Sequence, residues 1–401
     1  MRRKARCPSS RVDARDQATR QNVEEHLTST RTAPRLLTLG AALVLFAAAC
    51  NNTGTASTAP TAAAGNMDAL VAAAKTEGAL NVIALPHDWC NYGAMIDGFK
   101  AKYAGITVNE NLPDGGSGDE IEAIKTTKGQ TGPAVPDVID VGIAFGDSIK
   151  TDKLVQPYKV ATWDTIDSKF KDPDGYWYGD YGSILTFEIN KTAVANSPAD
   201  WKDLLKPEYA NKVALAGDPR VSSQAYNAVW AAALANGGSL DNAQPGLDFF
   251  KQLNTAGNLV PTIAKPGTID QGATPITIRW AYNALAHKDT AAGNPVIDVV
   301  VPVTGKFLGI YIQGISAYAP HPNAAKLWME YLYSDAGQAN WIKGYCNTTR
   351  LADLKARGVS SDLIAKLPDI TGAVYPTGDQ AKAAKTLITG QWDAVVGANI
   401  K

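Results

Sequence analysis

The sequence predicts an α/β fold built as two lobes that crossing strands join. Patterns typical of strands alternate with patterns typical of helices in two separate stretches of the chain. An aromatic, strand-like segment at 176–190 lies between these stretches, and long strand-like segments follow the second one. A chain that leaves one α/β lobe, builds a second and returns has this order, and such lobes close around ligands by hinge motion. The 401 residues also exceed one domain of ordinary size.

The first stretch begins with a helix and continues as alternating strands and helices. Residues 67–77 carry apolar side chains at helical spacing and stop at Gly78, a residue that commonly terminates helices. We then expect a strand at 79–86, a helix at 92–103, a strand at 106–112, a Gly-rich turn and helix at 114–128, and a buried strand at 136–141. This alternation carries the prediction of the first lobe.

The second stretch repeats the alternation. A helix is predicted at 197–205, because Ser197 can open it and Pro198 fits a first helical turn. We then expect a strand at 213–217, helices at 222–238 and 241–253, strands at 275–282, 296–302 and 309–319, and a helix at 323–337. The predicted domains are lobe 1 at 67–184 with 306–350, and lobe 2 at 185–305 with 351–401.

Residues 1–50 have the features of an export leader. Nine Lys/Arg and four Asp/Glu precede residue 36, and an uncharged apolar run then extends from Leu36 to Ala49, a length that suits a signal peptide better than a membrane span. The last residues of this run and Cys50 resemble a bacterial lipobox, so we expect lipidation of Cys50; an ordinary signal peptide cut near Ala49 is the alternative. Residues 51–66 have the composition of a flexible tether. The sequence thus predicts an exported protein held at the outer side of a membrane.

Charge and cysteine content narrow the function. After residue 35 the chain has 29 Lys/Arg and 35 Asp/Glu, a net charge of −6, which argues against a nucleic-acid partner because phosphate neutralisation needs a concentrated basic face. Cys90 and Cys346 remain once the leader is set aside. Outside the cytoplasm such a pair favours a disulfide, and two buried free thiols are the alternative.

Signatures of enzymes and metal sites are mostly absent from the sequence. There is no nucleophile elbow, zinc-protease helix, phosphate-binding P-loop or dinucleotide fingerprint. Ser168 and Lys171 fit an SxxK hydrolase motif, but its companion motifs are missing and the segment is charged, so we expect a surface turn and keep a hydrolase as the alternative. The histidines at 26, 87, 287 and 321 are not clustered as zinc requires. We therefore expect a protein that is not an enzyme, with no cofactor and no metal.

Aromatic and short polar side chains follow the predicted strands or open the predicted helices. Open α/β sheets bind ligands beyond the carboxyl ends of their strands, so these side chains are candidates for a ligand cleft. They are Trp89, Asn91 and Tyr92 after the first strand, Phe145 after the third, Ser117, Asp218 and Ser222 at helix starts, and Trp280 and Tyr282 at the end of a strand.

The order of these motifs resembles a known family. The segments that carry the resemblance are DWCNY, PDVIDV, DGYWYGDY, SPADWKDLLKPEYANKVAL, DPRVSSQAY, TPITIRWAYN and APHPNAAKLWMEYL, between about Leu80 and about Asn347. They resemble extracellular solute-binding proteins of bacterial ABC importers, in the branch of spermidine/putrescine, ferric iron and 2-aminoethylphosphonate binders. The resemblance implies a periplasmic-binding-protein-like fold, a ligand held between the lobes, and delivery to a membrane permease; we expect a monomer.

The resemblance also implies roles for individual residues. In polyamine binders two aromatic residues follow the first strand, and Trp89 and Tyr92 match them, so they are expected to stack on a cationic group. Asp218 matches an acidic ligand residue of that group. Trp280 matches an aromatic one.

Departures from the polyamine pattern point to another ligand. Asn91, Val221 and Tyr311 stand where polyamine binders have carboxylates, and ammonium groups need such partners when they leave water. No adjacent tyrosine pair of the ferric binders is present. Ser222 and Ser117 suit a phosphonate or carboxylate at helix starts. The expected ligand is a monoamine or a zwitterion such as an aminophosphonate, with a polyamine or ferric iron as alternatives.

Overall fold

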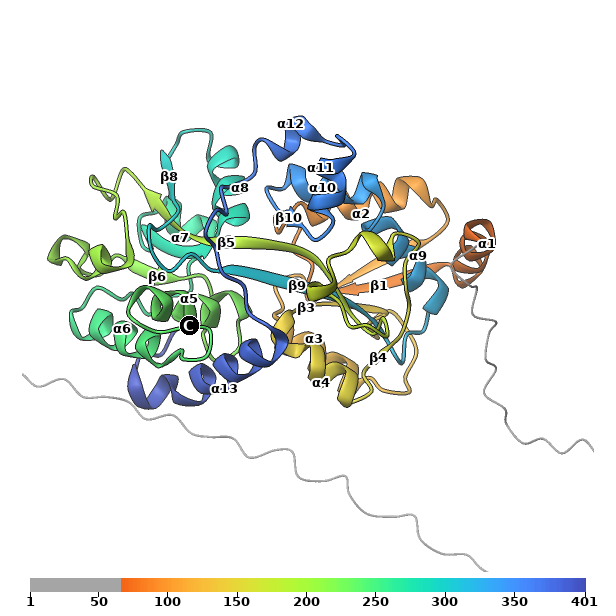
Figure 1. The fold of residues 1–401 in the computed structure, drawn as a ribbon, viewed down its shortest axis with the longest axis horizontal. Helices are drawn as coiled ribbons and strands as arrows, with labels where there is room; N and C mark the ends of the chain where they lie inside the picture. Colours follow the sequence, from red (N-terminus) through yellow and green to blue (C-terminus); the bar gives the residue numbers. More distant parts are fainter. Residues whose placement is uncertain (1–65) are drawn as a thin grey trace, which may run out of the picture. The chain divides into compact units, whose positions relative to one another are not determined.

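Two long antiparallel strands form the centre of the fold in the computed structural model, which describes residues 66–401. They are β5 (Tyr178–Asn190) and β9 (Leu308–Ser316). β5 pairs with β9 over its first half, and with β7 (Ile276–Trp280) and β8 (Ile297–Val300) over its second half. β5 therefore crosses between two groups of elements (Figure 1). A register shift between Gly179 and Gly182 interrupts the β5–β9 pairing, and bulges of this kind re-aim side chains.

The first group of elements surrounds one half of β5. β1 (Ala79–Ile83) pairs in parallel with β2 (Thr107–Asn111), and β3 (Val138–Gly142) pairs antiparallel with β9. The short strands β4 (Val155–Gln156) and β10 (Asn347–Thr348) pair with β9 and β5. The helices are α1 (Met67–Glu77), α2 (Tyr92–Lys102), α3 (Ser117–Thr126), α4 (Gly146–Thr151), α9 (Pro322–Leu332) and α10 (Asp335–Lys343). α1 packs on α9, and α2 packs on α10.

The second group surrounds the other half of β5. β6 (Val213–Leu215) pairs in parallel with β7, and α5 (Ser223–Ala235) packs on α6 (Gln244–Thr255). The remaining helices of this group are α7 (Pro266–Asp270) and α8 (Ala281–Ala291). The late helix α13 (Gly378–Val395) packs on α5 and α6 and also on η1 (Ile143–Phe145) of the first group (Figure 1). This helix therefore contacts both groups.

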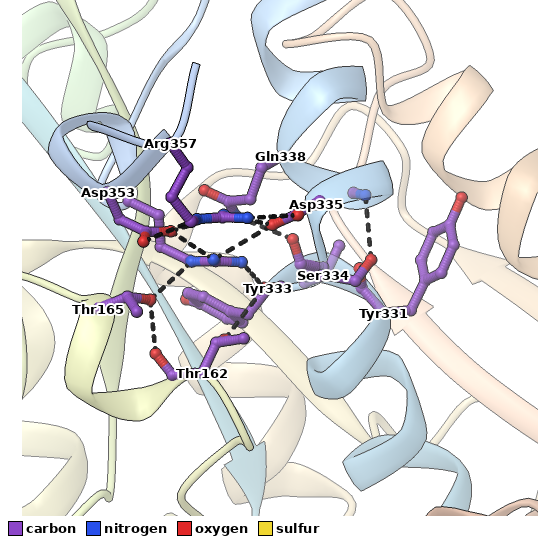
Figure 2. Close-up of polar contacts among 12 residues, drawn as sticks. Thr162, Thr165, Tyr331, Tyr333, Ser334, Asp335, Gln338, Asp353 and Arg357 are labelled. Atoms are coloured by element: carbon purple, nitrogen blue, oxygen red, sulfur yellow. Dashed lines mark hydrogen bonds and ion pairs between the residues drawn. The ribbon is translucent and has the colours of Figure 1, made fainter. Parts of the chain in front are cut away.

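An ion-pair network fixes α11 (Leu351–Ala356) to α10 (Figure 2). Asp335 of α10 accepts from Arg350 at 3.2 Å and from Arg357 at 2.7 Å. Asp353 of α11 accepts from the same two side chains at 2.6 and 2.8 Å. The short helix α12 (Ser361–Ile364) also contacts α10. The exact lobe boundaries given above stay a prediction.

Several predicted strands are shorter in the structure, among them those at 79–86 and 309–319, which end at Ile83 and Ser316. Three further predicted elements differ as follows, and local hydrogen bonds explain two of these differences. The helix predicted from Ser197 is a 3₁₀ helix at Trp201–Leu205, which the Asp200 side chain caps. The helix predicted at 323–337 is two helices, because Ser334 caps a new one by accepting from Gly337 N. The strand predicted at 275–282 ends at Trp280, where α8 follows directly.

A disulfide joins Cys90 and Cys346, whose Cα atoms lie 5.9 Å apart. It ties the turn before α2 to the segment before β10, 256 residues further along the chain. The predicted leader, the lipidation site Cys50 and residues 51–65 of the tether lie outside the described residues. Within residues 66–401, no helix combines the length and the apolar character needed to cross a bilayer.

Candidate ligand-binding site

A cavity of about 390 Å³ lies where the two groups of elements meet. The first group contributes the turn after β1, the start of α3 and the middle of β3. The second group contributes the loop before α5, the end of β7 and the first turn of α8. β9 adds Tyr311. This volume lies in the range of sites for small molecules.

Two helix starts meet at the cavity wall. Ser117 is the first residue of α3 and Ser223 the first of α5, and their hydroxyl oxygens lie 3.1 Å apart. Ser222 caps α5 by accepting from Ala225 N at 3.4 Å. The first N–H groups of a helix have no acceptor within the helix and carry a partial positive charge. This part of the wall favours an anionic group.

Arg279 brings a positive charge to the same side of the cavity. Its Nη1 donates to Glu188 Oε2 at 3.0 Å, while its buried Nε has no hydrogen-bond partner among residues 66–401. Glu188 also contacts His287 Nδ1, a hydrogen bond that raises the pKa of the imidazole. Asn283 Oδ1 is likewise buried without a partner in this part of the chain. Arg279 and Asn283 both line the cavity, so both keep polar groups available to a ligand.

Buried carboxyl groups of α3 and β3 form a second part of the wall, which we call the acidic wall. Asp140 Oδ2 accepts from the Tyr92 hydroxyl at 2.6 Å and from the Tyr181 hydroxyl at 2.8 Å. Glu120 Oε2 accepts from Asp140 N at 2.7 Å. Burial raises the pKa of Asp140 to about 7, and burial likewise raises the pKa of Glu120 and that of Asp180 behind them well above the usual range. Asp140 and Glu120 line the cavity.

Aromatic rings close the space between these carboxyl groups and the second group. The Trp89 ring lies edge-on to Tyr282 and to Tyr311, with centroids 5.4 and 5.9 Å apart. Trp89 Nε1 donates to the Tyr181 hydroxyl at 2.8 Å, so the indole is fixed by the same residue that donates to Asp140. Trp89 and Tyr311 line the cavity. The acidic wall therefore carries two π-faces.

The structure brings five of the sequence-predicted residues into the cavity wall, namely Trp89, Ser117, Asp218, Ser222 and Tyr311. The Asp218 carboxylate, however, already has a cation. Both of its oxygens lie 2.9 Å from Arg220 Nε, and Arg220 Nη1 reaches Asp393 of α13 at 3.1 Å. Asp218 is thus held by the protein itself.

The other five predicted residues lie behind the wall. Tyr92 is completely buried and contacts the cavity only through Asp140. Trp280 and Tyr282 are buried around Trp89 and Tyr311. Lys385 of α13 covers the Phe145 ring at 3.5 Å from its centroid, and Asn91 donates to the Asn340 carbonyl. A strand-end position therefore did not ensure a place in the wall.

The wall also contains four polar residues that were not among the predicted site residues: Glu120, Asp140, Arg279 and Asn283. Two of them had a signal in the sequence. Asp140 interrupts the apolar strand VIDVG and Arg279 interrupts ITIRW. A charged residue within a buried strand needs a partner or a ligand.

The hydrolase motif has no catalytic geometry in the structure. Lys171 Nζ donates to the Trp163 carbonyl at 2.7 Å and lies over the Trp163 ring. Ser168 is exposed in a short 3₁₀ helix, and no hydrogen bond links it to Lys171 within residues 66–401. The same part of the chain gathers no three His, Cys, Asp or Glu side chains in a metal-binding arrangement.

Comparisons with known proteins agree with this architecture. A family described as bacterial extracellular solute-binding protein matches residues 134–357, more than half of the chain. The periplasmic binding protein AfuA from Actinobacillus pleuropneumoniae, with exogenous fructose-6-phosphate bound, is 20% identical with a TM-score of 0.63, covering 80% of this chain and 99% of its own. Iron-bound HitA from Pseudomonas aeruginosa is 16% identical with a TM-score of 0.61, and the match covers 80% of this chain and 99% of that one.

A third similar structure is a putative spermidine/putrescine ABC transporter from Listeria monocytogenes. It is 14% identical with a TM-score of 0.59, and the match covers 79% of this chain and 99% of that one. At such identities the likeness establishes the two-lobe periplasmic-binding-protein fold. No curated protein matches the chain significantly.

Proposed function

Because the chain belongs to the family of bacterial extracellular solute-binding proteins, we propose that it captures a small zwitterion, such as an aminophosphonate, for an ABC importer. Its general role as the substrate-binding component of such an importer follows from the family. The ligand class is the part that the cavity supports. Binding would draw the two lobes together, and the permease would receive the solute from the closed form.

One observation carries the choice of a zwitterion: one part of the cavity wall favours an anion and another part favours a cation. Arg279 and the start of α5 favour an anionic group, whereas Asp140 of β3 and Glu120 of α3 favour a cationic one. A ligand with both groups satisfies both parts at once. A purely anionic or purely cationic solute leaves one part without a partner, which costs free energy in a buried site.

The similar structures are compatible with this proposal. AfuA was solved with a sugar phosphate, whose phosphate group shares the charge and oxygen geometry of a phosphonate. The Listeria protein is described as a putative transporter of polyamines, which share the ammonium group. A small aminophosphonate combines these two features in one molecule.

Membrane attachment is a further part of the proposal. The lipobox-like segment before Cys50 supports a lipid anchor at the outer face of the membrane, with residues 51–66 as its tether. A single diacylated cysteine would keep the binding protein close to its permease.

A thermal-shift screen tests the ligand class. The mature protein is heated with 2-aminoethylphosphonate, with putrescine and spermidine, with neutral sugars and with ferric citrate. A ligand that binds only the folded state raises Tm by mass action, so we expect the largest increase with 2-aminoethylphosphonate. An increase confined to sugars, polyamines or ferric citrate would contradict the zwitterion proposal and leave the family assignment intact.

A further inference from the structure

The carboxyl groups of Glu120 and Asp140 have no cation of the protein beside them. Glu120 is 1% exposed and Asp140 5% exposed, yet no Lys, Arg or His of residues 66–401 forms an ion pair with either. Their partners are neutral donors: the Tyr92 and Tyr181 hydroxyls for Asp140 and a backbone N–H for Glu120. Uncompensated buried carboxylates are strongly unfavourable, so they either hold protons or receive a cation from outside.

One oxygen of this pair is left for a ligand. Asp140 Oδ1 is buried and has no hydrogen-bond partner among the described residues, although Asp140 lines the cavity. Tyr92 and Tyr181 both donate to the other oxygen, which fixes the plane of the carboxyl group. Gln313 donates to the Tyr92 hydroxyl at 2.8 Å and to Asp180 at 3.1 Å. The Tyr92 hydroxyl oxygen therefore already accepts a hydrogen bond within the protein. The arrangement pre-positions one acceptor at the cavity wall.

Trp89 and Tyr311 complete the surroundings of this acceptor. Both rings line the cavity, and a cation over an aromatic face gains from the ring quadrupole, most of all when water is excluded. A primary ammonium group offers three N–H donors and one positive charge, which match two carboxyl groups and a π-face. A methylated quaternary ammonium would lack the donors that Asp140 Oδ1 requires.

Building on the proposed function, we propose that Asp140 and Glu120 form the specificity-determining site for a primary ammonium group, and that this group replaces a proton which the pair holds without ligand. The exchange balances: an ammonium enters, one carboxyl proton leaves to solvent, and the net charge of the buried pair and its cation stays constant. A solute without the amine leaves the proton in place. The pair therefore selects amine-bearing solutes and links their binding to pH.

Burial favours proton retention on the pair without ligand, whereas the hydrogen bonds that Tyr92 and Tyr181 donate favour the ionised form of Asp140. Asp180 and Tyr181 face it from β5, Tyr92 from α2 and Tyr311 from β9, and none of these brings a positive charge. Arg279 and Lys265 are the cationic residues that line the cavity; neither forms an ion pair with Asp140 or Glu120, and Arg279 Nη1 is bound to Glu188. Burial raises the pKa of Asp140 to about 7, so an ammonium ligand displaces its proton most strongly below that pH.

The experiment compares 2-aminoethylphosphonate with ethylphosphonate by isothermal titration calorimetry between about pH 5.5 and about pH 8. The phosphonate is common to both probes, so the ratio of their Kd values isolates the amine. We expect 2-aminoethylphosphonate to bind at least about tenfold more tightly near pH 8, a preference that shrinks as the pH falls below about 7. Buffers of different ionisation enthalpy should report more proton release at pH 6 for 2-aminoethylphosphonate than for ethylphosphonate, which can release only its phosphonate proton.

Conservative variants test whether Asp140 and Glu120 are the residues that bind the amine. Asp140→Asn and Glu120→Gln should each reduce the preference for the amine at least about fivefold, remove the extra proton release and keep the affinity for ethylphosphonate within about twofold. Each variant tests the proposal by itself, so if one fails to fold the other remains decisive; the Tm of each variant checks its folding. Asp97→Asn, at an exposed carboxylate of α2 outside the cavity wall, should keep the preference.

The outcomes separate the two proposals. Equal affinity for both probes, or an amine preference that survives both variants, would overturn the ammonium site while the binding of small anions remained. Binding of neither probe would overturn the zwitterion proposal and the ammonium site together.

Discussion

Arg350 and Arg279 are both buried, with 2% and 6% of their surface exposed, but they differ in how many of their N–H groups have partners. Arg350 donates from Nε to the Thr165 hydroxyl, from Nη1 to the Tyr333 carbonyl, and from Nη2 to Asp335 and Asp353 (Figure 2). Arg279 donates from Nη1 to Glu188, and its buried Nε has no partner among the described residues.

The difference separates an arginine that serves the fold from one that is available to a ligand. A guanidinium whose donors are all satisfied holds several segments in one geometry. An unsatisfied buried donor costs free energy, and such groups in native proteins are found where function requires them. The comparison therefore predicts that Arg350 controls stability and that Arg279 controls affinity.

The largest expected effect is on the stability of the Arg350→Met variant. It removes donors to the Tyr333 carbonyl and to the Thr165 hydroxyl inside the protein, so we expect the free energy of unfolding to fall by about 3 kcal/mol. Urea denaturation measures this loss. Ligand affinity of the folded variant should stay within about twofold.

Arg357→Met is the matched control, because Arg357 pairs with the same two carboxylates, Asp335 and Asp353, at the surface (Figure 2). Its side chain is 41% exposed, so its loss should lower the free energy of unfolding much less than the loss of Arg350 does. Similar losses in both variants would show that the buried donors of Arg350 add nothing beyond its surface partners.

Much of the fold was predictable from the sequence because the spacing of apolar residues distinguishes strands from helices. The alternation that predicted strands near 79–86 and 136–141 is realised as β1 and β3, and the helix from Met67 ends at Gly78 in the left-handed conformation that favours glycine. Periodicity failed where single hydrogen bonds decide. Asp200 and Ser334 each cap a new turn inside a segment that reads as one helix.

The site was predictable only in part, because strand-end position gives the neighbourhood of a side chain and not its direction. Trp89 and Tyr92 lie three residues apart after the same strand, yet Trp89 lines the cavity and Tyr92 is buried behind Asp140. The partners of a residue also come from distant segments. Asp218 lines the cavity as expected, but Arg220 neutralises it, and Asp393 of α13, 173 residues beyond Arg220, binds the same guanidinium.

The second largest effect should follow from Arg279→Lys. Lysine keeps a positive charge beside Glu188, so stability should change by no more than about 1 kcal/mol, but it lacks the planar fork that binds oxyanions through two donors. We expect the Kd for ethylphosphonate and for 2-aminoethylphosphonate to rise by the same factor of about ten or more, measured by calorimetry. An increase for only one of the probes would place Arg279 at the amine and not at the anion.

The smallest expected effects concern His287, whose protonation should make both stability and anion affinity depend on pH. The hydrogen bond to Glu188 raises the pKa of His287 above its usual value of 6.5, so between about pH 6 and about pH 8 the folded chain holds this proton more tightly than the unfolded chain. The free energy of unfolding should therefore fall as the pH rises through this interval, and His287→Gln should flatten the fall. His321→Gln is the control, because Asp137 raises the pKa of His321 in the same way.

The two histidine variants should differ in ligand binding. His321 contacts Asp137, whereas His287 shares Glu188 with Arg279, so only His287 affects how strongly Glu188 neutralises that guanidinium. When His287 loses its proton, Glu188 compensates Arg279 alone and the cavity becomes less favourable for an anion. The affinity for ethylphosphonate should thus decline modestly above about pH 7 in the wild type and in His321→Gln but not in His287→Gln. The same pH dependence of ethylphosphonate affinity in all three proteins would show that the charge of His287 does not affect anion binding at Arg279. It would contradict this prediction.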